Sequence, residues 1–322
     1  MIGKTNIGVE DLSALLTTQS NLITNITDVL NTKCASDNGK YVWEKWSISG
    51  TTKLEFIEYV VSDNNAEYPA DGIKDGYYYK FIINQAYSWA NATDAVIVSM
   101  VAAADAGEID LSQYWAVGDE RTVHLSAMSA TGVGESHIEQ DVKLVILNKG
   151  GKALLNGKEC NFIVGLKNVL KEFGYMNSSN TNSGSWNSCA RRTWCNNTFK
   201  NSIPTTLLPI FKQHVNKTAT EYNISSLTDS TDWFALAAEI EVFGSRTYSP
   251  NVEANGSLSQ FEYYKTAANR IKTFGEGGEN TYWWERSPYY ANSYSFCYVN
   301  GSNTANFGYA HSANGLAPFG CI

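Results

Sequence analysis

The sequence contains no apolar run close to the roughly 20 residues that a membrane-spanning helix requires. The opening segment, MIGKTNIGVEDLSALL, also lacks the basic and apolar regions of a signal peptide, so we expect neither membrane insertion nor export by that route. Basic clusters are missing as well, and the net charge of −8 is spread over both halves of the 322-residue chain. Nucleic acids and anionic membranes attract such clusters, so neither is an expected partner.

Cysteine is scarce, which excludes the disulfide framework of a small secreted domain. The two cysteines of CARRTWC are separated by five residues, too many for a redox or zinc half-site, and no second Cys or His cluster follows nearby. We therefore expect no metal and no cofactor. Most of the cysteines are predicted to be buried thiols: Cys34, Cys160, Cys189, Cys195, Cys297 and Cys321.

Catalytic motifs are also absent: none of the four histidines stands in a GxSxG, HExxH, P-loop or GxGxxG context. Cys189 and His214 would form a nucleophile pair if they lay on adjacent helices. A buried thiol and a surface histidine are the simpler expectation. The sequence by itself gives no reason to assign an enzyme.

Charged residues near the C-terminus have structural interpretations. Glu239 and Glu241 are two positions apart and are expected to be solvated or helix-end carboxylates, as is Glu262 further on. Glu285 and Arg286 stand inside the aromatic run YWWERSP, so they are expected to be partly buried and paired with each other.

The N-terminal third divides into a helix and a small β unit. Apolar residues at steps of four and three predict a heptad helix over residues 1–32, which either packs on its own domain or drives self-association. Residues 33–105 become aromatic and β-branched, and three strands are expected to form a meander. The heptad positions are Leu12, Leu16, Ile23, Ile26 and Leu30, and the strands are 41–48, 54–62 and 76–83.

A larger unit is expected over residues 106–322, because strand and helix patterns mix there without regular βαβ alternation. This arrangement favours an α+β fold over a doubly wound sheet. The predicted strands are 142–148 and 160–166, and the predicted helices are 188–203, 205–215 and 261–271.

The last stretch of the chain has a narrow vocabulary. Residues 289–316 contain no Lys, Arg, Asp, Glu, Gln, Met or Trp, and they are crowded with Asn, Ser, Tyr, Gly and Ala. Tyr gives large amphipathic contact area at little entropic cost, and Ser, Gly and Asn give adaptable hydrogen bonding, as in antibody loops. The composition is typical of a binding surface carried on loops.

Separated motifs resemble a known group of proteins. The order WWERSP, FCYVN, ANFGYA, NGLAPFGCI resembles the phage and prophage proteins of gut Firmicutes that carry a C-type-lectin-like (formylglycine-generating-enzyme-like) domain. Upstream matches at YMNSSNTNSGSWNSCARRTWCNNTF, DWFALAAEIEVFGS and FEYYKTAANRIK extend the resemblance over roughly residues 112–322. It implies a C-terminal C-type-lectin-like domain behind the small helix and meander unit.

Many members of that group look like variable proteins of diversity-generating retroelements, in which template adenines are randomised. An AAC codon randomised at both adenines never yields Lys, Glu, Gln, Met or Trp, and none of these five occurs from Ser287 to Ile322. The resemblance thus implies a variable region at about 283–322. Its expected ligand-binding residues are Tyr289, Tyr290, Ala291, Tyr294, Ser295, Tyr298, Phe307, Gly308, Tyr309, His311, Ser312 and Ala313.

Framework and core positions are expected between the variable ones. Trp283, Trp284 and Arg286 would hold the fold constant, together with the GLAPFGCI segment. Phe296 and Phe319 interrupt the polar texture and are expected in the core, as is Val299. The six tyrosine, phenylalanine and histidine positions 289, 290, 294, 307, 309 and 311 are expected to be exposed on one face.

The function implied by the resemblance is that of a receptor-binding adhesin at a phage tail tip or fibre, made in the bacterial cytoplasm and carried on the virion. Its expected partners are a host cell-surface protein or glycan, other virion proteins and two further copies in a homotrimer. A non-variable decoration protein of the virion is an alternative. A copper oxidase of the formylglycine-generating type is another, with Cys297 and Cys321 as its candidate cysteines.

Overall fold

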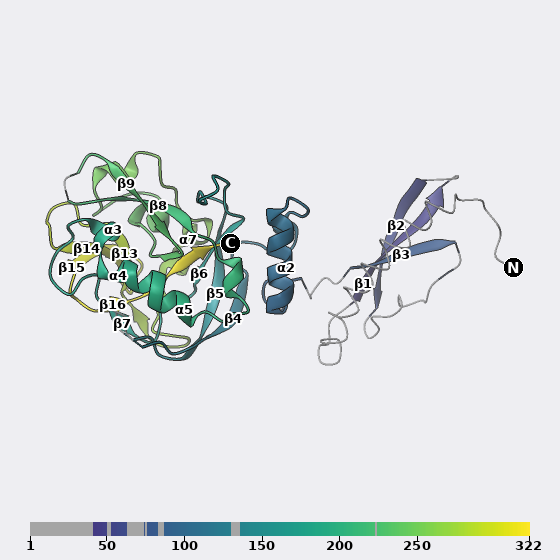
Figure 1. Ribbon diagram of the computed structural model, residues 1–322, viewed down its shortest axis with the longest axis horizontal. Helices are drawn as coiled ribbons and strands as arrows, with labels where there is room; N and C mark the ends of the chain where they lie inside the picture. Colours follow the sequence, from purple (N-terminus) through teal and green to yellow (C-terminus); the bar gives the residue numbers. More distant parts are fainter. Residues whose placement is uncertain are drawn as a thin grey trace. The chain divides into compact units, whose positions relative to one another are not determined.

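The computed structural model describes residues 41–49, 53–62, 74, 76–82, 87–129, 136–222 and 224–322 (Figure 1). The predicted heptad helix of residues 1–32 and Cys34 lie outside these residues. The chain divides into two compact units between Val96 and Ile97, whereas the sequence predicts a domain boundary after residue 105.

The first unit contains an antiparallel three-stranded sheet whose strands match the predicted ones. The strands are β1 (Tyr41–Ser49), β2 (Lys53–Ser62) and β3 (Tyr77–Ile82). Their order is β2-β1-β3, so the predicted meander is wrong: β1 is central and pairs with both others. Consecutive strands are forced to pair only when a tight hairpin turn joins them. Residues 63–76 separate β2 from β3, so these two strands need not pair with each other.

Helix α2 (Asp94–Asp105) occupies the Ala-rich stretch that ends at the predicted domain boundary. The Thr93 hydroxyl accepts a hydrogen bond from the Val96 N–H (3.2 Å), as an N-cap residue does. Small and apolar residues therefore form a helix here instead of a linker.

Two five-stranded sheets dominate the second unit, and the pairs within them are antiparallel except β13 with β16. The first has the order β10-β17-β6-β5-β4, and the second β15-β14-β13-β16-β7. The strands of the first are β4 (Glu120–Leu125), β5 (Gln140–Lys149), β6 (Phe162–Leu166), β10 (Phe234–Ala235) and β17 (Phe319–Cys321). Those of the second are β7 (Phe173–Gly174), β13 (Trp283–Pro288), β14 (Ser295–Val299), β15 (Ala305–Tyr309) and β16 (Asn314–Gly315).

Two strand pairs and short helices complete this unit. The pairs are β8 (His214–Ala219) with β9 (Leu227–Asp232), and β11 (Lys272–Thr273) with β12 (Asn280–Thr281). The α-helices are α3 (Ser185–Ser188), α4 (Ala190–Trp194), α5 (Lys200–Ser202), α6 (Glu239–Phe243) and α7 (Glu262–Lys265). A π-helix covers Cys195–Phe199, and 3-10 turns cover Leu111–Gln113, Leu208–Ile210, Asn251–Ala254 and Ala267–Arg270.

Of the three helices predicted in this unit, one is largely confirmed and the other two differ in the structure. Helical structure covers most of 188–203, as expected, but 261–271 forms two short turns instead of one helix. The helix predicted over 205–215 is wrong, because only a 3-10 turn around Pro209 forms before β8 begins. Proline has no N–H and clashes with the preceding turn, which stops the helix. The fold is thus mixed, with several antiparallel sheets and few helices, compatible with the α+β prediction.

The framework strand β13 lies in the core, and every one of its residues is buried. Trp283 and Trp284 are fully buried, as predicted, and so are Phe296, Val299 and Phe319. β13 pairs with β14 on one edge and β16 on the other, and it also contacts α3, α6 and β8, which lie outside its sheet. The residues that follow β16 to the C-terminus, 316–322, are buried too.

Replacing Trp284 with Phe should lower the free energy of unfolding by about 2 kcal/mol. The Trp284 indole N–H donates to the Gly174 carbonyl (2.8 Å), and the substitution leaves that buried oxygen unpaired and removes ring volume. Urea denaturation measures the change. Tyr309→Phe is the control, because this ring is 54% exposed, and a Trp284→Phe midpoint equal to that of the wild type would contradict the assignment.

Candidate binding surface

Two loops at the ends of the β13–β15 strands carry most of the predicted binding residues. Residues 289–294 connect β13 to β14, and residues 310–313 connect β15 to β16. The Ala310 N–H donates to the Tyr294 carbonyl (2.9 Å), so the loops lie side by side. The buried Asn182 amide donates to the carbonyls of Asn292 and Ser295 (2.8 Å each), which fixes the first loop.

Stacked rings form one part of this surface. Tyr289 and Phe307 stack with ring centroids 3.8 Å apart and planes 7° from parallel. Tyr248 lies 5.2 Å from Phe307, and Tyr290 lies 5.1 Å from Tyr289. Tyr289 and Phe307 are half-buried, whereas Tyr290 is 43% exposed. The exposed Tyr290 ring therefore lies at the edge of the Tyr289–Phe307 stack.

A second, more exposed group of rings consists of Tyr294 in the first loop, Tyr309 at the end of β15 and His311 in the second loop. The Tyr294 and Tyr309 rings are 5.6 Å apart, and His311 follows at 6.4 Å from Tyr309. His311 is exposed and its ring Nδ1 is hydrogen-bonded to the Asn180 side chain. This group thus combines aromatic rings with hydrogen-bonding side chains, a combination that suits an amphipathic ligand.

We call the seven residues of these two groups the tyrosine surface: Tyr248, Tyr289, Tyr290, Tyr294, Phe307, Tyr309 and His311. Of the positions predicted to be variable, six are exposed: Tyr290, Ala291, Tyr294, Tyr309, His311 and Ala313. Five are half-buried: Tyr289, Tyr298, Phe307, Gly308 and Ser312. The six aromatic and histidine positions are therefore not all exposed, because Tyr289 and Phe307 cover each other.

Ser295 corrects the predicted binding set, since it is 1% exposed and its side chain is closed to a ligand. It opens β14, and its carbonyl accepts bonds from Tyr289 and Asn182. Gly308 and Tyr298 lie on the face of the sheet opposite Phe307, because residues alternate along a strand and β14 pairs with β15 in register. A Cβ on Gly308 would meet the Tyr298 ring at 3.2 Å.

Sequence reasoning missed several contributors from outside the C-terminal stretch. The Arg246 guanidinium lies 5.2 Å from the Tyr290 ring centre, in cation–π geometry, and Tyr248 belongs to the same loop. The Tyr290 N–H donates to the Tyr248 carbonyl (2.9 Å), which joins this loop to the surface. Asn180 and Asn182 come from further upstream. No local pattern marks these residues, because only tertiary contact brings them here.

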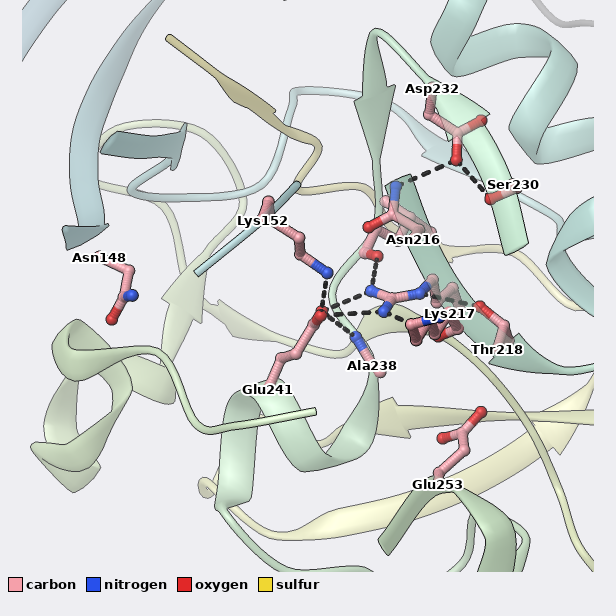
Figure 2. A network of polar contacts seen from close by, with 12 residues as sticks. Asn148, Lys152, Asn216, Lys217, Thr218, Ser230, Asp232, Ala238, Glu241 and Glu253 are labelled. Carbon is pink, nitrogen blue, oxygen red and sulfur yellow. Dashed lines mark hydrogen bonds and ion pairs between the residues drawn. The ribbon is translucent and has the colours of Figure 1, made fainter. Parts of the chain in front are cut away.

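A buried ionic network joins β13 to α6 and β8. Figure 2 shows Lys152 and Ala238 converging on Glu241, which also pairs with Arg286. One Arg286 nitrogen donates to Glu241 Oε1 at 2.9 Å, and the guanidinium also donates to Thr218 and to the Leu236 carbonyl. Burial tends to raise the pKa of Glu241, but the charges of Arg286 and Lys152 outweigh it and lower the pKa to about 2.

The structure corrects two expectations about charged residues. Glu239 and Glu241 are helix-end carboxylates at the start of α6, which is one of the two interpretations given from the sequence, but they are buried and not solvated. Arg286 pairs with Glu241 and not with Glu285, because adjacent residues of a strand point to opposite faces. Both Glu285 side-chain oxygens are buried without a hydrogen-bond partner, and burial raises the pKa of this carboxyl well above its usual range. Burial without a hydrogen-bond partner therefore favours the neutral form of this carboxyl.

A second buried acid, Glu253, gives a pH-dependent prediction. It accepts hydrogen bonds from the Ser287 hydroxyl and the Ala219 N–H, while burial raises its pKa from 4.5 to about 7. Between these two values the folded state keeps a proton that the unfolded state has lost, so stability falls as the pH rises from about 4.5 to about 7.

Glu253→Gln should remove that fall. Relative to the wild type, the free energy of unfolding of the variant should gain roughly 2 to 3 kcal/mol between pH 4.5 and pH 8, since one pKa unit corresponds to about 1.4 kcal/mol. Denaturation curves at both pH values measure this gain. Parallel pH profiles for the two proteins would contradict the burial of an acid at this position.

The sulfur and imidazole groups do not form the nucleophile pair considered from the sequence. Cys189 caps α4 and burial raises its pKa to about 12. His214 lies on β8, is fully buried and was wrongly expected at the surface, and burial lowers its pKa to about 4. Cys297 and Cys321 lie on different five-stranded sheets. The five cysteines in the described ranges are buried free thiols, as predicted.

No helix in the described part of the chain is both long and apolar enough to cross a bilayer. Among the same residues, no three His, Cys, Asp or Glu side chains gather in a way that would hold a metal ion.

Comparison with known proteins gives one family. No curated protein and no solved structure matches the chain. A family described as "Domain of unknown function (DUF6273)" matches residues 152–322, from Lys152 of the buried network to the last residue. This segment contains both loops of the tyrosine surface and the framework beneath them. Because the match covers more than half of the sequence, the chain belongs to this family.

Proposed function

We propose that the tyrosine surface binds a host cell-surface protein or glycan, and that the chain is a receptor-binding adhesin of a phage or prophage particle. One observation carries the proposal: two loops of restricted vocabulary, Tyr289–Tyr294 and Ala310–Ala313, lie side by side on a framework that is buried throughout. Loops on a rigid scaffold accept substitution without loss of the fold, which is what a diversified site requires. The role proposed is binding and not catalysis.

The aromatic content of the loops supports a binding role. Tyrosine is enriched among the residues that contribute most of the binding energy at interfaces. Three tyrosines of the surface are each more than 40% exposed: Tyr290, Tyr294 and Tyr309. We propose a C-type-lectin-like fold for residues 106–322 and retroelement diversification of about 283–322. Both rest on the motif order and the codon vocabulary set out above.

Adsorption of the purified, fluorescently labelled chain to bacteria tests the proposal. We expect saturable binding to cells of the species whose genome carries the gene or to close relatives, and no binding to unrelated bacteria. Mass spectrometry of purified particles should detect the protein on the virion. Its presence in particles without any cell binding would instead assign it as a decoration protein, and its absence from particles would refute the virion role.

The DNA beside the gene tests diversification separately. A near-copy of the 3′ end that differs at adenine positions, together with a reverse-transcriptase gene, is the expected finding. If neither is present, the narrow vocabulary has another origin, although binding by the tyrosine surface would remain testable.

Association into a trimer would add avidity to a weak individual site. We propose that residues 1–32 drive it, because of their heptad pattern. Light scattering of the full chain should give three times the 35.5 kDa chain mass, and a variant lacking residues 1–32 should be monomeric. A monomeric full chain would refute this proposal.

A further inference from the structure

Strand β15 forms one end of the sheet whose loops carry the tyrosine surface. Among the described strands, β14 alone pairs with it. The pairing is continuous over five residue pairs, from Ser295 with Tyr309 to Val299 with Ala305. An edge strand of this kind presents one row of backbone N–H and C=O groups that its own sheet does not use.

Hydrogen bonds at the two ends of β15 show which positions face away from β14. The Asn300 N–H donates to the Thr304 carbonyl at 2.9 Å. The Ala310 N–H donates to the Tyr294 carbonyl, also at 2.9 Å. Even positions therefore face β14, and because the backbone turns over at each residue of a strand, the odd positions 305, 307 and 309 face outward.

The Asn306 side chain marks the outward direction at the middle of the strand. Its Oδ1 accepts a hydrogen bond from the Phe307 N–H at 2.8 Å. This amide oxygen takes the place that the carbonyl of a further strand would occupy. Asn306 is only half-buried, so its side chain can turn aside and leave the Phe307 N–H to a partner.

The sequence of β15, ANFGY, has none of the features that discourage pairing at a sheet edge. Proteins commonly protect such edges with charged residues, proline or a β-bulge. β15 contains no charged residue and no proline, and its register with β14 does not shift. By contrast β4, at the end of the other five-stranded sheet, carries Glu120, Arg121 and His124. The β15 edge is therefore open to a further strand.

We propose that an extended segment of the receptor pairs with β15, so that the ligand of the tyrosine surface is a protein and not a glycan. This inference rests on the proposed function and names the chemical class of its ligand. Backbone donors and acceptors that repeat at every second residue match another extended polypeptide, which has the same repeat. The hydroxyl groups of a glycan do not follow it.

The place of β15 fits this role. It supplies Phe307 and Tyr309 to the tyrosine surface, so a segment paired with its edge lies beside those rings. In strand addition, main-chain hydrogen bonds give affinity and side-chain contacts give specificity. Main-chain bonds do not depend on side-chain identity, so they anchor a ligand at a site whose other contacts vary.

Adsorption of the labelled full chain to treated cells tests the class of ligand. Cells of the species that carries the gene are treated with a broad protease or with periodate, which cleaves sugar rings. We expect protease to abolish adsorption and periodate to leave it unchanged. Adsorption that survives protease and is lost after periodate would overturn this inference and leave the proposed function standing. A wild-type chain that adsorbs to no cells would refute the proposed function, and this inference with it.

A backbone variant tests the pairing itself. Ala305→Pro removes an outward N–H at the first residue of an edge strand, a position where proline is tolerated. We expect adsorption to weaken about tenfold or more, because a carbonyl of the receptor segment loses its donor. Ala305→Ser keeps the N–H and is the control, which should adsorb like the wild type. Urea denaturation checks that both variants fold.

A second pair of variants decides the matter if Ala305→Pro does not fold. Asn306→Lys places a charge on the edge, which opposes strand addition, and should weaken adsorption to a similar extent. Asn306→Gln is its control and should adsorb normally. Normal adsorption of folded Ala305→Pro, or of Asn306→Lys in its place, would overturn the proposal. So would a loss of oligomer mass on either substitution in light scattering, since β15 would then pair with a second copy of the chain.

Discussion

Replacing Tyr290, Tyr294 and Tyr309 together with alanine should abolish binding to host cells while the free energy of unfolding stays close to that of the wild type. Exposed aromatic anchors typically contribute about 2 kcal/mol or more each to an interface, so the loss of three exceeds a thousandfold in affinity even if their effects are partly redundant. Substitutions at exposed positions usually change folding by within about 0.5 kcal/mol each. Cell adsorption and urea denaturation measure the two effects.

The choice of these three tyrosines follows from burial. They are 43%, 42% and 54% exposed, whereas Tyr289 is half-buried against Phe307, and its removal would disturb the stack. In a triple variant that includes Tyr289, a loss of cell binding could come either from the missing contact with the receptor or from disruption of the Tyr289–Phe307 stack.

Three other exposed tyrosines of the same unit form the control. Tyr114, Tyr222 and Tyr282 are 41%, 41% and 52% exposed and lie outside the tyrosine surface. Their simultaneous replacement with alanine removes a similar exposed aromatic area and should leave adsorption unchanged. Equal loss of binding in both triple variants would refute the assignment of the site, as would normal adsorption of the first.

The second large effect is expected at Arg286. Replacing it with Met should lower the free energy of unfolding by about 3–5 kcal/mol, because Glu241 would lose its bidentate partner inside the core. Glu253 and Glu285 would also lose the charge that offsets their burial. The carbonyls of Leu236 and Lys217 would lose a donor.

A double-mutant cycle separates charge pairing from packing. Glu241→Leu combined with Arg286→Met removes both partners, so the double variant should be less destabilised than the sum of the single ones. Urea denaturation of all four proteins at pH 7 gives the coupling energy. Additive losses would show that the two side chains act independently and would contradict the network of Figure 2.

The strands and core that the sequence predicted are those with strong local patterns. The aromatic, β-branched segments 41–48 and 54–62 form strands, and Trp283 and Trp284 are buried. The hydrophobic pattern gives wrong predictions where another constraint on the backbone overrides it. Pro209 halted the expected helix at 205–215, and the central place of β1 depends on a connection whose path the sequence does not reveal.

The partners of charged residues depend on contacts between distant segments. Glu285 and Arg286 are neighbours in sequence, and their separation onto opposite faces of β13 sends Arg286 to Glu241, 45 positions away. The network also draws in Lys152, which is 89 positions from Glu241. Closeness in sequence is a poor guide to which charged residues of a strand pair, because successive side chains point to opposite faces of the sheet.

The sequence by itself determined the vocabulary of the C-terminal loops and the apolar framework between them, since composition and local periodicity are readable without coordinates. Only the tertiary structure decided which of those residues are exposed, because exposure depends on what packs over each side chain. It covered Phe307 with Tyr289, closed Ser295 into the core, and brought Tyr248 and Arg246 from another loop to the tyrosine surface.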